Sequence, residues 1–133
     1  MNEHTAAPEA EAAVLGSMIL EPDCIDKVLG IMPHDAFYYP ENRLLLEAIL
    51  EARDKHPLKD GKIDIVVIRD SLKRANQLGN VGGVDYIVQV VESVPGAANA
   101  EYYATIVKEK ALCRELNTAG GKILSMIEER GDV

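Results

Sequence analysis

Apolar residues recur every three or four positions along most of this 133-residue chain, with polar residues between them. This spacing is typical of amphipathic α-helices. It predicts a first helix over residues 8–20, a short second helix over residues 25–32 and a third helix that opens at Pro40. Pro8 suits the first position of its helix, and Pro33 ends the second. The apolar positions that define these faces are Val14, Leu15, Met18, Ile19, Ile25, Val28, Leu29, Met32, Leu44, Leu45, Ala48 and Ile49.

Two stretches rich in β-branched residues, 63–68 and 86–91, would on propensity alone form strands. We nevertheless expect helices, because apolar residues recur at helical spacing once the flanking residues are included. Asp64 can cap the first of these helices, and a turn from Gly79 to Gly83 separates the two. The residues at helical spacing are Ile65, Ile68, Leu72 and Ala75, and then Tyr86, Ile87, Val90, Val91 and Val94.

The last third of the chain predicts one long helix. Asn99 is a suitable N-cap, and between Ala100 and Arg130 only Gly120 and Gly121 weaken a helix. That pair costs about 2 kcal/mol relative to alanine, which does not prevent the helix from forming. At 1.5 Å per residue the helix would be roughly 46 Å long, whereas a globule of about 100 residues has a radius of gyration near 13 Å. The helix is therefore expected to extend beyond the globule.

The apolar pattern changes along this helix. The residues placed to face the globule are Tyr103, Ile106, Val107 and Ala111. A row with the 4-3-4-3 spacing of a short coiled coil follows, and we call it the seam: Leu112, Leu116, Ala119, Ile123 and Met126. Two interpretations remain open. Either the seam pairs with a helix of another chain, or it packs on the core of its own domain and Gly120–Gly121 ends the helix.

These elements predict an all-α protein, with a small helical globule of about five helices over residues 8–98 and a long helix over residues 99–131. The length suits one domain with a real core. Aromatic residues make up only 5% of the chain, so the core must consist of Leu, Ile, Val, Ala and Met. No apolar run approaches the ~18 residues of a membrane span, and the N-terminus lacks a signal pattern. A cytoplasmic location is therefore expected.

The net charge of −8 is unevenly distributed, with −7 over residues 1–60 and −1 over residues 61–133. A domain that grips nucleic acid concentrates Lys and Arg, because neutralised phosphates supply much of the affinity. We therefore expect this chain alone to bind DNA poorly. The acidic pairs are expected to be solvated helix faces that also interact with helix dipoles, as in Glu9/Glu11 and Glu128/Glu129.

The sequence predicts no catalytic, cofactor or metal site. Gly61–Lys62 and Gly121–Lys122 superficially resemble phosphate loops, but neither has a Gly five positions earlier or a following Ser or Thr. The histidines have no companion ligands at metal-binding spacing; they are His4, His34 and His56. Cys24 and Cys113 are far apart in the sequence and are expected to be buried free thiols.

Three motifs carry a family resemblance. Residues 9–16 are Glu-Ala-Glu-Ala-Ala-Val-Leu-Gly, and residues 81–87 are Val-Gly-Gly-Val-Asp-Tyr-Ile. Residues 95–107 are Pro-Gly-Ala-Ala-Asn-Ala-Glu-Tyr-Tyr-Ala-Thr-Ile-Val, at the entry to the long helix. Together these motifs resemble the N-terminal domain of bacterial replicative DNA helicases of the DnaB type. The resemblance covers about residues 8–131, nearly the whole chain.

The resemblance implies a non-catalytic collar domain. In this family a helical globule is followed by a helical hairpin, hairpins of neighbouring subunits pair, and the domains form a collar in a hexameric ring. A RecA-like motor domain that binds ATP and DNA follows. The long helix would then be the first hairpin arm, and Gly131–Asp132 would begin its turn. The second arm and the motor would be absent from this chain. The implied partners are the chain itself (as a dimer or a hexamer collar), primase and a helicase loader, with DNA reached only through the motor domain.

Matched positions in the resemblance suggest residues that face primase or the collar interface: Glu9, Tyr86, Asn117, Ile123 and Leu124. Tyr86 could equally belong to the core, with its hydroxyl at the rim. Asn117 departs from the apolar residue common at its position in the family. The segment 35–38 is similar to the family's Asp-Phe-Tyr turn, with Ala36 replacing the more usual acidic residue.

Two other classes of protein stay open. One is a stand-alone helical adaptor of phage or plasmid origin that binds primase or helicase. The other is a distant helicase-binding domain of primase, which has a similar helical plan. A downstream reading frame with a motor domain would favour the helicase, whereas a natural stop after Val133 would favour the adaptor.

Overall fold

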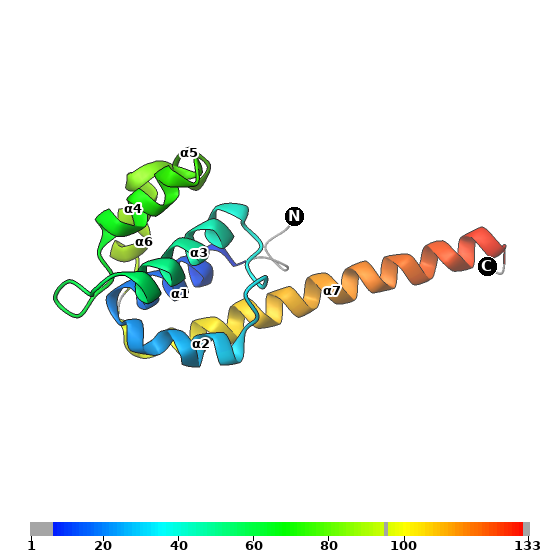
Figure 1. Ribbon diagram of the computed structural model, residues 1–133. Coiled ribbons are helices and arrows are strands. Elements are labelled where there is room, and N and C mark those ends of the chain that lie inside the picture. The colour runs from blue at the N-terminus through cyan, green and yellow to red at the C-terminus, as the bar shows by residue number, and fades with distance from the viewer. Residues whose placement is uncertain (1–6, 95, 132–133) are drawn as a thin grey trace.

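The computed structural model describes residues 7–94 and 96–131, which form a helical globule with one long projecting helix (Figure 1). The all-α prediction is confirmed. The α-helices are α1 (Pro8–Leu20), α2 (Ile25–Ile31), α3 (Pro40–Lys55), α4 (Ile65–Arg74), α5 (Leu78–Val81), α6 (Gly83–Glu92) and α7 (Ala100–Arg130), and short 3-10 turns cover Pro22–Cys24 and Ala97–Asn99. Some positions discussed above lie outside the described residues: His4, Pro95 and Asp132.

Helix α1 is the centre of the globule, and 9 of its 13 residues are buried. It packs against α3, α6 and the first turns of α7. Gly16 permits the close approach of α6, because a Cβ atom there would lie 2.5 Å from the backbone oxygen of Val90 and would overlap the Val94 side chain. A helix that is apolar on nearly every side is typical of such a central position.

Both β-branched stretches form helices, as predicted, with α4 beginning at Ile65 after the capping residue Asp64 and α6 covering residues 86–91. Asp64 caps α4, and its Oδ1 accepts a hydrogen bond of 2.9 Å from the Val66 backbone N–H. Ile68 and Ile87 from these helices are fully buried in the core. The expected turn between them is partly wrong, because it contains the short helix α5, whose Val81 is buried against the core.

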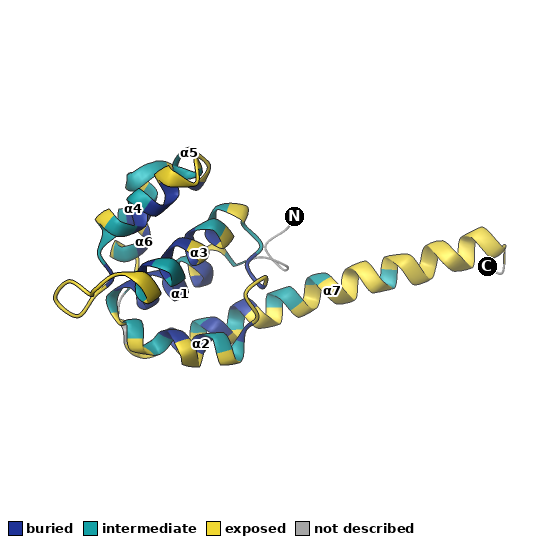
Figure 2. Cartoon of the chain, viewed as in Figure 1, coloured by how far each residue is buried: buried dark blue, intermediate teal, exposed yellow. Residues whose placement is uncertain are grey.

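Helix α7 runs from Ala100 to Arg130, as predicted, and it continues through the glycine pair. Asn99 occupies the N-cap position of α7, as predicted, but it does not act as a side-chain cap. Its side chain makes no capping hydrogen bond, because Asn99 is the last residue of the 3-10 turn that leads into α7. The first turns of α7 bury Ala104 and Val107 in the globule, whereas the distal half is almost entirely exposed (Figure 2).

Candidate protein-interaction surfaces

The seam is a row of exposed side chains on the part of α7 that leaves the globule. Leu116 is 71% exposed and Ile123 is 58% exposed. Leu112 and Met126 are exposed as well, as is the small Ala119 between them. Single apolar side chains on a surface are ordinary, but a contiguous row of them marks an interaction site.

The large apolar side chains of the seam face away from the globule, whereas the small Ala119 lines a cleft between α7 and the segment between α2 and α3. Leu116 follows the buried Val107 by nine residues, which is two and a half helical turns, so the two side chains point to opposite sides of α7. Arg114 follows Val107 by about two turns and therefore continues the side that faces the globule. The interpretation that the seam packs on the core of its own domain is wrong.

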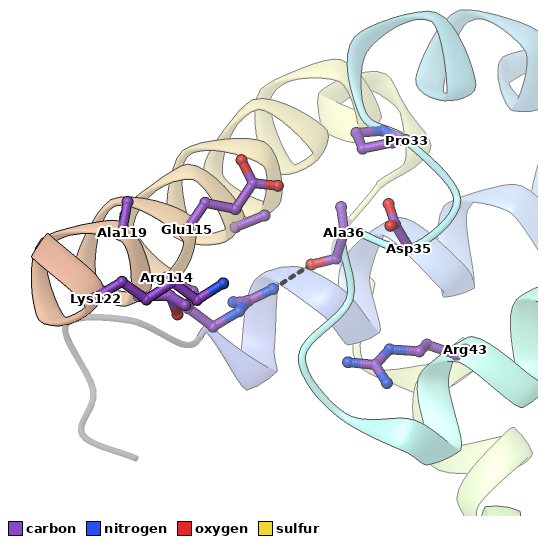
Figure 3. A pocket seen from close by; sticks show the side chains of 10 residues that line it. Pro33, Asp35, Ala36, Arg43, Arg114, Glu115, Ala119 and Lys122 are labelled. Carbon is purple, nitrogen blue, oxygen red and sulfur yellow. Dashed lines mark hydrogen bonds between the residues drawn. The ribbon is translucent and has the colours of Figure 1, made fainter. Parts of the chain in front are cut away.

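Arg114 fastens the middle of α7 to the segment between α2 and α3. Its Nη2 donates a hydrogen bond of 2.6 Å to the Ala36 carbonyl oxygen (Figure 3). Its guanidinium carbon lies 5.3 Å from the centre of the Tyr38 ring, which is within cation–π range. On the other side of the same segment, Arg43 Nε donates a 2.7 Å hydrogen bond to the Phe37 carbonyl oxygen. The two arginines therefore fix the direction in which α7 leaves the globule.

An open cleft of about 390 Å³ lies between this segment and α7. Its charged lining has both signs: Asp35, Arg43, Arg114, Glu115 and Lys122 (Figure 3). Because both arginines bind backbone carbonyl groups, the cleft is best understood as part of the junction between globule and helix.

Glu11 is the buried group that organises this junction from inside the globule. Its carboxylate accepts hydrogen bonds from the Tyr38 backbone N–H at 2.7 Å and from Asn42 Nδ2 at 2.8 Å. The Tyr39 N–H makes a third, longer contact of 3.4 Å. Burial raises the pKa of the Glu11 carboxyl, and these hydrogen bonds act in the opposite direction. The expectation that Glu11 is solvated is wrong, because α1 lies at the centre of the globule and even its polar positions face protein.

The same network reaches a second surface through Tyr86. The Tyr86 hydroxyl donates a hydrogen bond to Asn42 Oδ1, and Asn42 in turn binds Glu11. Burial raises the pKa of Tyr86, which keeps its hydroxyl protonated as a donor. The ring of Tyr86 lines a mostly apolar cleft of about 560 Å³ between α1, α6 and α7. The other residues at this cleft include Pro8, Glu9, Ala12, Gln89 and Tyr103.

The structure separates the five partner-facing residues suggested by the resemblance. Glu9 and Tyr86 line the same cleft, although they are far apart in the sequence. Ile123 lies in the seam, on the projecting part of α7. Asn117 and Leu124 are exposed at about 80–100° around the helix axis from Leu116, so they lie beside the seam. Their roles as contacts stay predictions.

Within residues 7–94 and 96–131, no group of three or more His, Cys, Asp or Glu side chains could hold a metal ion. No helix in that part of the chain is long and apolar enough to cross a membrane. The expectation of buried thiols is wrong for Cys113, which is exposed because it lies on the projecting part of α7. Cys24 is half-buried, and burial raises the pKa of its thiol to about 11.

A helical globule with one long helix that presents an apolar seam to solvent defines a class of all-α domain. The family described as the DnaB-like helicase N terminal domain matches residues 3–109. The chain belongs to this family, as the resemblance predicted.

Individual relatives agree with this assignment. The replicative DNA helicase DnaB of Leifsonia xyli subsp. xyli is 36% identical over 117 residues, which cover 88% of this chain and 25% of the relative. The replicative DNA helicase DnaB of Mycobacterium leprae is 38% identical over 115 residues, covering 86% of this chain and 18% of the relative. The crystal structure of the N-terminal domain of DnaB helicase from Mycobacterium tuberculosis is 37% identical, with a TM-score of 0.82, and the match covers 91% of this chain and 83% of that chain. The chain thus spans a quarter or less of the length of these curated relatives.

Proposed function

We propose that this chain is the collar domain of a hexameric replicative DNA helicase, where it mediates subunit assembly and binds primase during DNA replication. Its contribution is non-catalytic, and the ATP-dependent motor that contacts DNA would be a separate domain of the same cytoplasmic protein. The observation that carries the proposal is the exposed apolar seam on the side of α7 opposite the globule. Membership of the DnaB-like helicase N terminal domain family supports the proposal that the chain works as part of a replicative helicase.

The seam is suited to weak pairing of isolated chains. Burying one Leu or Ile side chain contributes about 1.5–3 kcal/mol, and the seam offers four large apolar side chains in each copy. Association costs about 4–15 kcal/mol in lost freedom, and the glycine pair makes the paired helix less rigid. We therefore expect self-association with a dissociation constant in the micromolar range or weaker.

Sedimentation velocity over a concentration series tests this assembly role. The combined Leu116→Asp and Ile123→Asp variant should remain monomeric while its circular dichroism and melting temperature stay close to those of the unmodified chain. A matched control carries Thr118→Asp and Ser125→Asp, which make the same change on the side of α7 away from the seam and should leave association intact. Wholesale unfolding of the seam variant would mean that these residues stabilise the globule and that the proposal is wrong.

For primase, and for a helicase loader that contacts the same ring, we favour the cleft lined by Glu9 and Tyr86. Its wall is mostly apolar and an exposed carboxylate stands at its rim, so it suits an apolar side chain with a basic neighbour. Calorimetric titration with purified primase from the same organism should show weaker binding after Glu9→Lys. Glu21→Lys, at the opposite end of α1, should bind like the unmodified chain. If the unmodified chain, Glu9→Lys and Glu21→Lys all bind primase with equal affinity, this cleft is not part of the primase interface.

A further inference from the structure

A tight hairpin projects from the globule between α3 and α4, on the side away from the free end of α7 (Figure 1). Lys59 and Lys62 exchange two backbone hydrogen bonds in it, with N···O distances of 2.8 and 3.0 Å. Asp60 and Gly61 form the turn, and both have positive φ angles, 54° and 76°. An Asp-Gly pair is favoured in this type of two-residue turn, so the hairpin has one well-defined shape. We call residues 58–62 the lysine hairpin.

The lysine hairpin is attached to the core at its base. Ile63 follows it directly, is only 4% exposed and belongs to the hydrophobic core. The Ile63 backbone N–H donates a hydrogen bond of 2.9 Å to the Ile19 carbonyl oxygen, at the end of α1. On the other side, the His56 N–H closes the last turn of α3 by a hydrogen bond of 3.1 Å to the Ala52 carbonyl oxygen. The hairpin therefore presents its side chains at a fixed place on the globule.

The hairpin holds two like charges close together. Residues that exchange both hydrogen bonds of an antiparallel pair lie directly opposite each other, with Cα atoms about 5.5 Å apart and side chains on the same face. Like charges in that arrangement are destabilising. Lys59 and Lys62 are both exposed, and neither belongs to a salt bridge among the residues that the structure describes. An anionic group bound between the two ammonium groups would replace this repulsion with attraction.

The surroundings of the lysine pair are unusual for this chain in two ways. Residues 55–62 carry a charge of +2, whereas all other residues together carry −10. Across the described residues before α7, Leu58 and Val66 are the two exposed large apolar side chains, each 46% exposed. Leu58 directly precedes Lys59, and Val66 lies in the first turn of α4, four residues after Lys62. Cations and exposed apolar groups therefore occur together here, on an otherwise acidic protein.

We propose that the lysine hairpin binds an acidic segment of a partner protein, in which an apolar residue stands beside the carboxylates. The carboxylates pair with Lys59 and Lys62, and the apolar residue covers Leu58. A nucleic acid fits this surface less well, because a long polyanion meets the negative charge of the rest of the chain, whereas a short segment touches only the hairpin. The hairpin shares no residue with the seam or with the cleft lined by Glu9 and Tyr86, so the inference is independent of the proposed function.

Amide NMR spectra of the isotope-labelled chain, titrated at low salt with the synthetic peptide Ser-Glu-Glu-Leu-Glu-Glu-Ser, test the proposal. The signals of Lys59, Gly61 and Lys62 should shift together, with a dissociation constant of about 1 mM or tighter. The combined Lys59→Gln and Lys62→Gln variant should bind the peptide about tenfold more weakly or worse, because both cations are lost. Its melting temperature should stay at least as high as that of the unmodified chain, since a repulsion between exposed side chains is removed.

The matched control is the combined Lys27→Gln and Lys73→Gln variant, which removes the same charge from two exposed positions on α2 and α4. It should bind the peptide like the unmodified chain. Hairpin signals that do not move at several millimolar peptide, or equal weakening in the two double variants, would overturn the proposal. An oligothymidylate that shifts the hairpin signals at lower concentration than the peptide would also overturn it, because the surface would then prefer a nucleic acid.

Discussion

Glu11→Ala removes a buried acceptor that holds the segment before α3 from inside the globule. The lost contacts include two short hydrogen bonds, from the Tyr38 N–H at 2.7 Å and from Asn42 at 2.8 Å. Hydrogen bonds to a charged acceptor contribute about 1.5–3 kcal/mol each, so these two account for about 3–6 kcal/mol. Burial of the carboxylate outweighs these hydrogen bonds in its effect on the pKa, which is raised, so the ionised group contributes less than their sum; the loss in Glu11→Ala also includes the cost of leaving the Tyr38 N–H and Asn42 Nδ2 without an acceptor. We expect a net loss of about 3 kcal/mol in the free energy of unfolding, which lowers the melting temperature by roughly 10 °C.

Urea denaturation followed by circular dichroism measures this loss. Glu9→Ala is the matched control, because Glu9 lies two residues earlier on α1 and is exposed. Its removal should cost less than about 1 kcal/mol, which is the range of an exposed interaction with a helix dipole. If Glu11→Ala costs no more than Glu9→Ala, the buried carboxylate does not hold the junction and the network reasoning is refuted.

Three further predictions concern the fold. Gly16→Ala should destabilise the globule by about 1–3 kcal/mol, because the added Cβ would meet α6. Gly30→Ala places its Cβ in open space and should stabilise the globule by about 0.5–1 kcal/mol. Thermal melts of the two variants compare these effects. Gly120→Ala with Gly121→Ala should slow amide hydrogen exchange in the distal half of α7 and leave exchange in the globule unchanged, since both added methyl groups face open space. Because the pKa of Glu11 is raised in the folded chain, the contribution of Glu11 to the free energy of unfolding is fully present below about pH 4.5, its ordinary pKa. That contribution declines as the pH rises through the raised pKa. The loss of stability caused by Glu11→Gln, measured with urea, should therefore be larger at pH 4.5 than at neutral pH; an equal loss at both would contradict the direction of the shift.

The helices were predictable because their signals are local. The range of α7 follows from the absence of any Pro between Ala100 and Arg130, and the start of α4 follows from the capping carboxylate of Asp64. The spacing of Leu116 and Ile123 likewise indicated the exposed seam, because the predicted helix is longer than the globule can cover. These features depend on neighbours within a few residues along the chain.

The junction was not predictable, because its signals are distant in sequence. Glu11 looks like an ordinary acidic residue in a first turn, and its partners at Tyr38 and Asn42 follow it by 27 and 31 residues. The approach of α6 to Gly16 depends on how two whole helices pack. Ala36 and Arg114 interact through a backbone carbonyl, so the side chain at position 36 gives no sign of the contact.

Methyl NMR spectra of the 133-residue chain over a concentration series test the central claim most directly. Pairing through the seam predicts that the methyl signals of Leu116, Ile123 and Met126 shift together as the concentration rises toward millimolar, while that of the buried Val107 stays in place. Seam signals that do not move, or shifts confined to residues of the globule, would contradict assembly through α7.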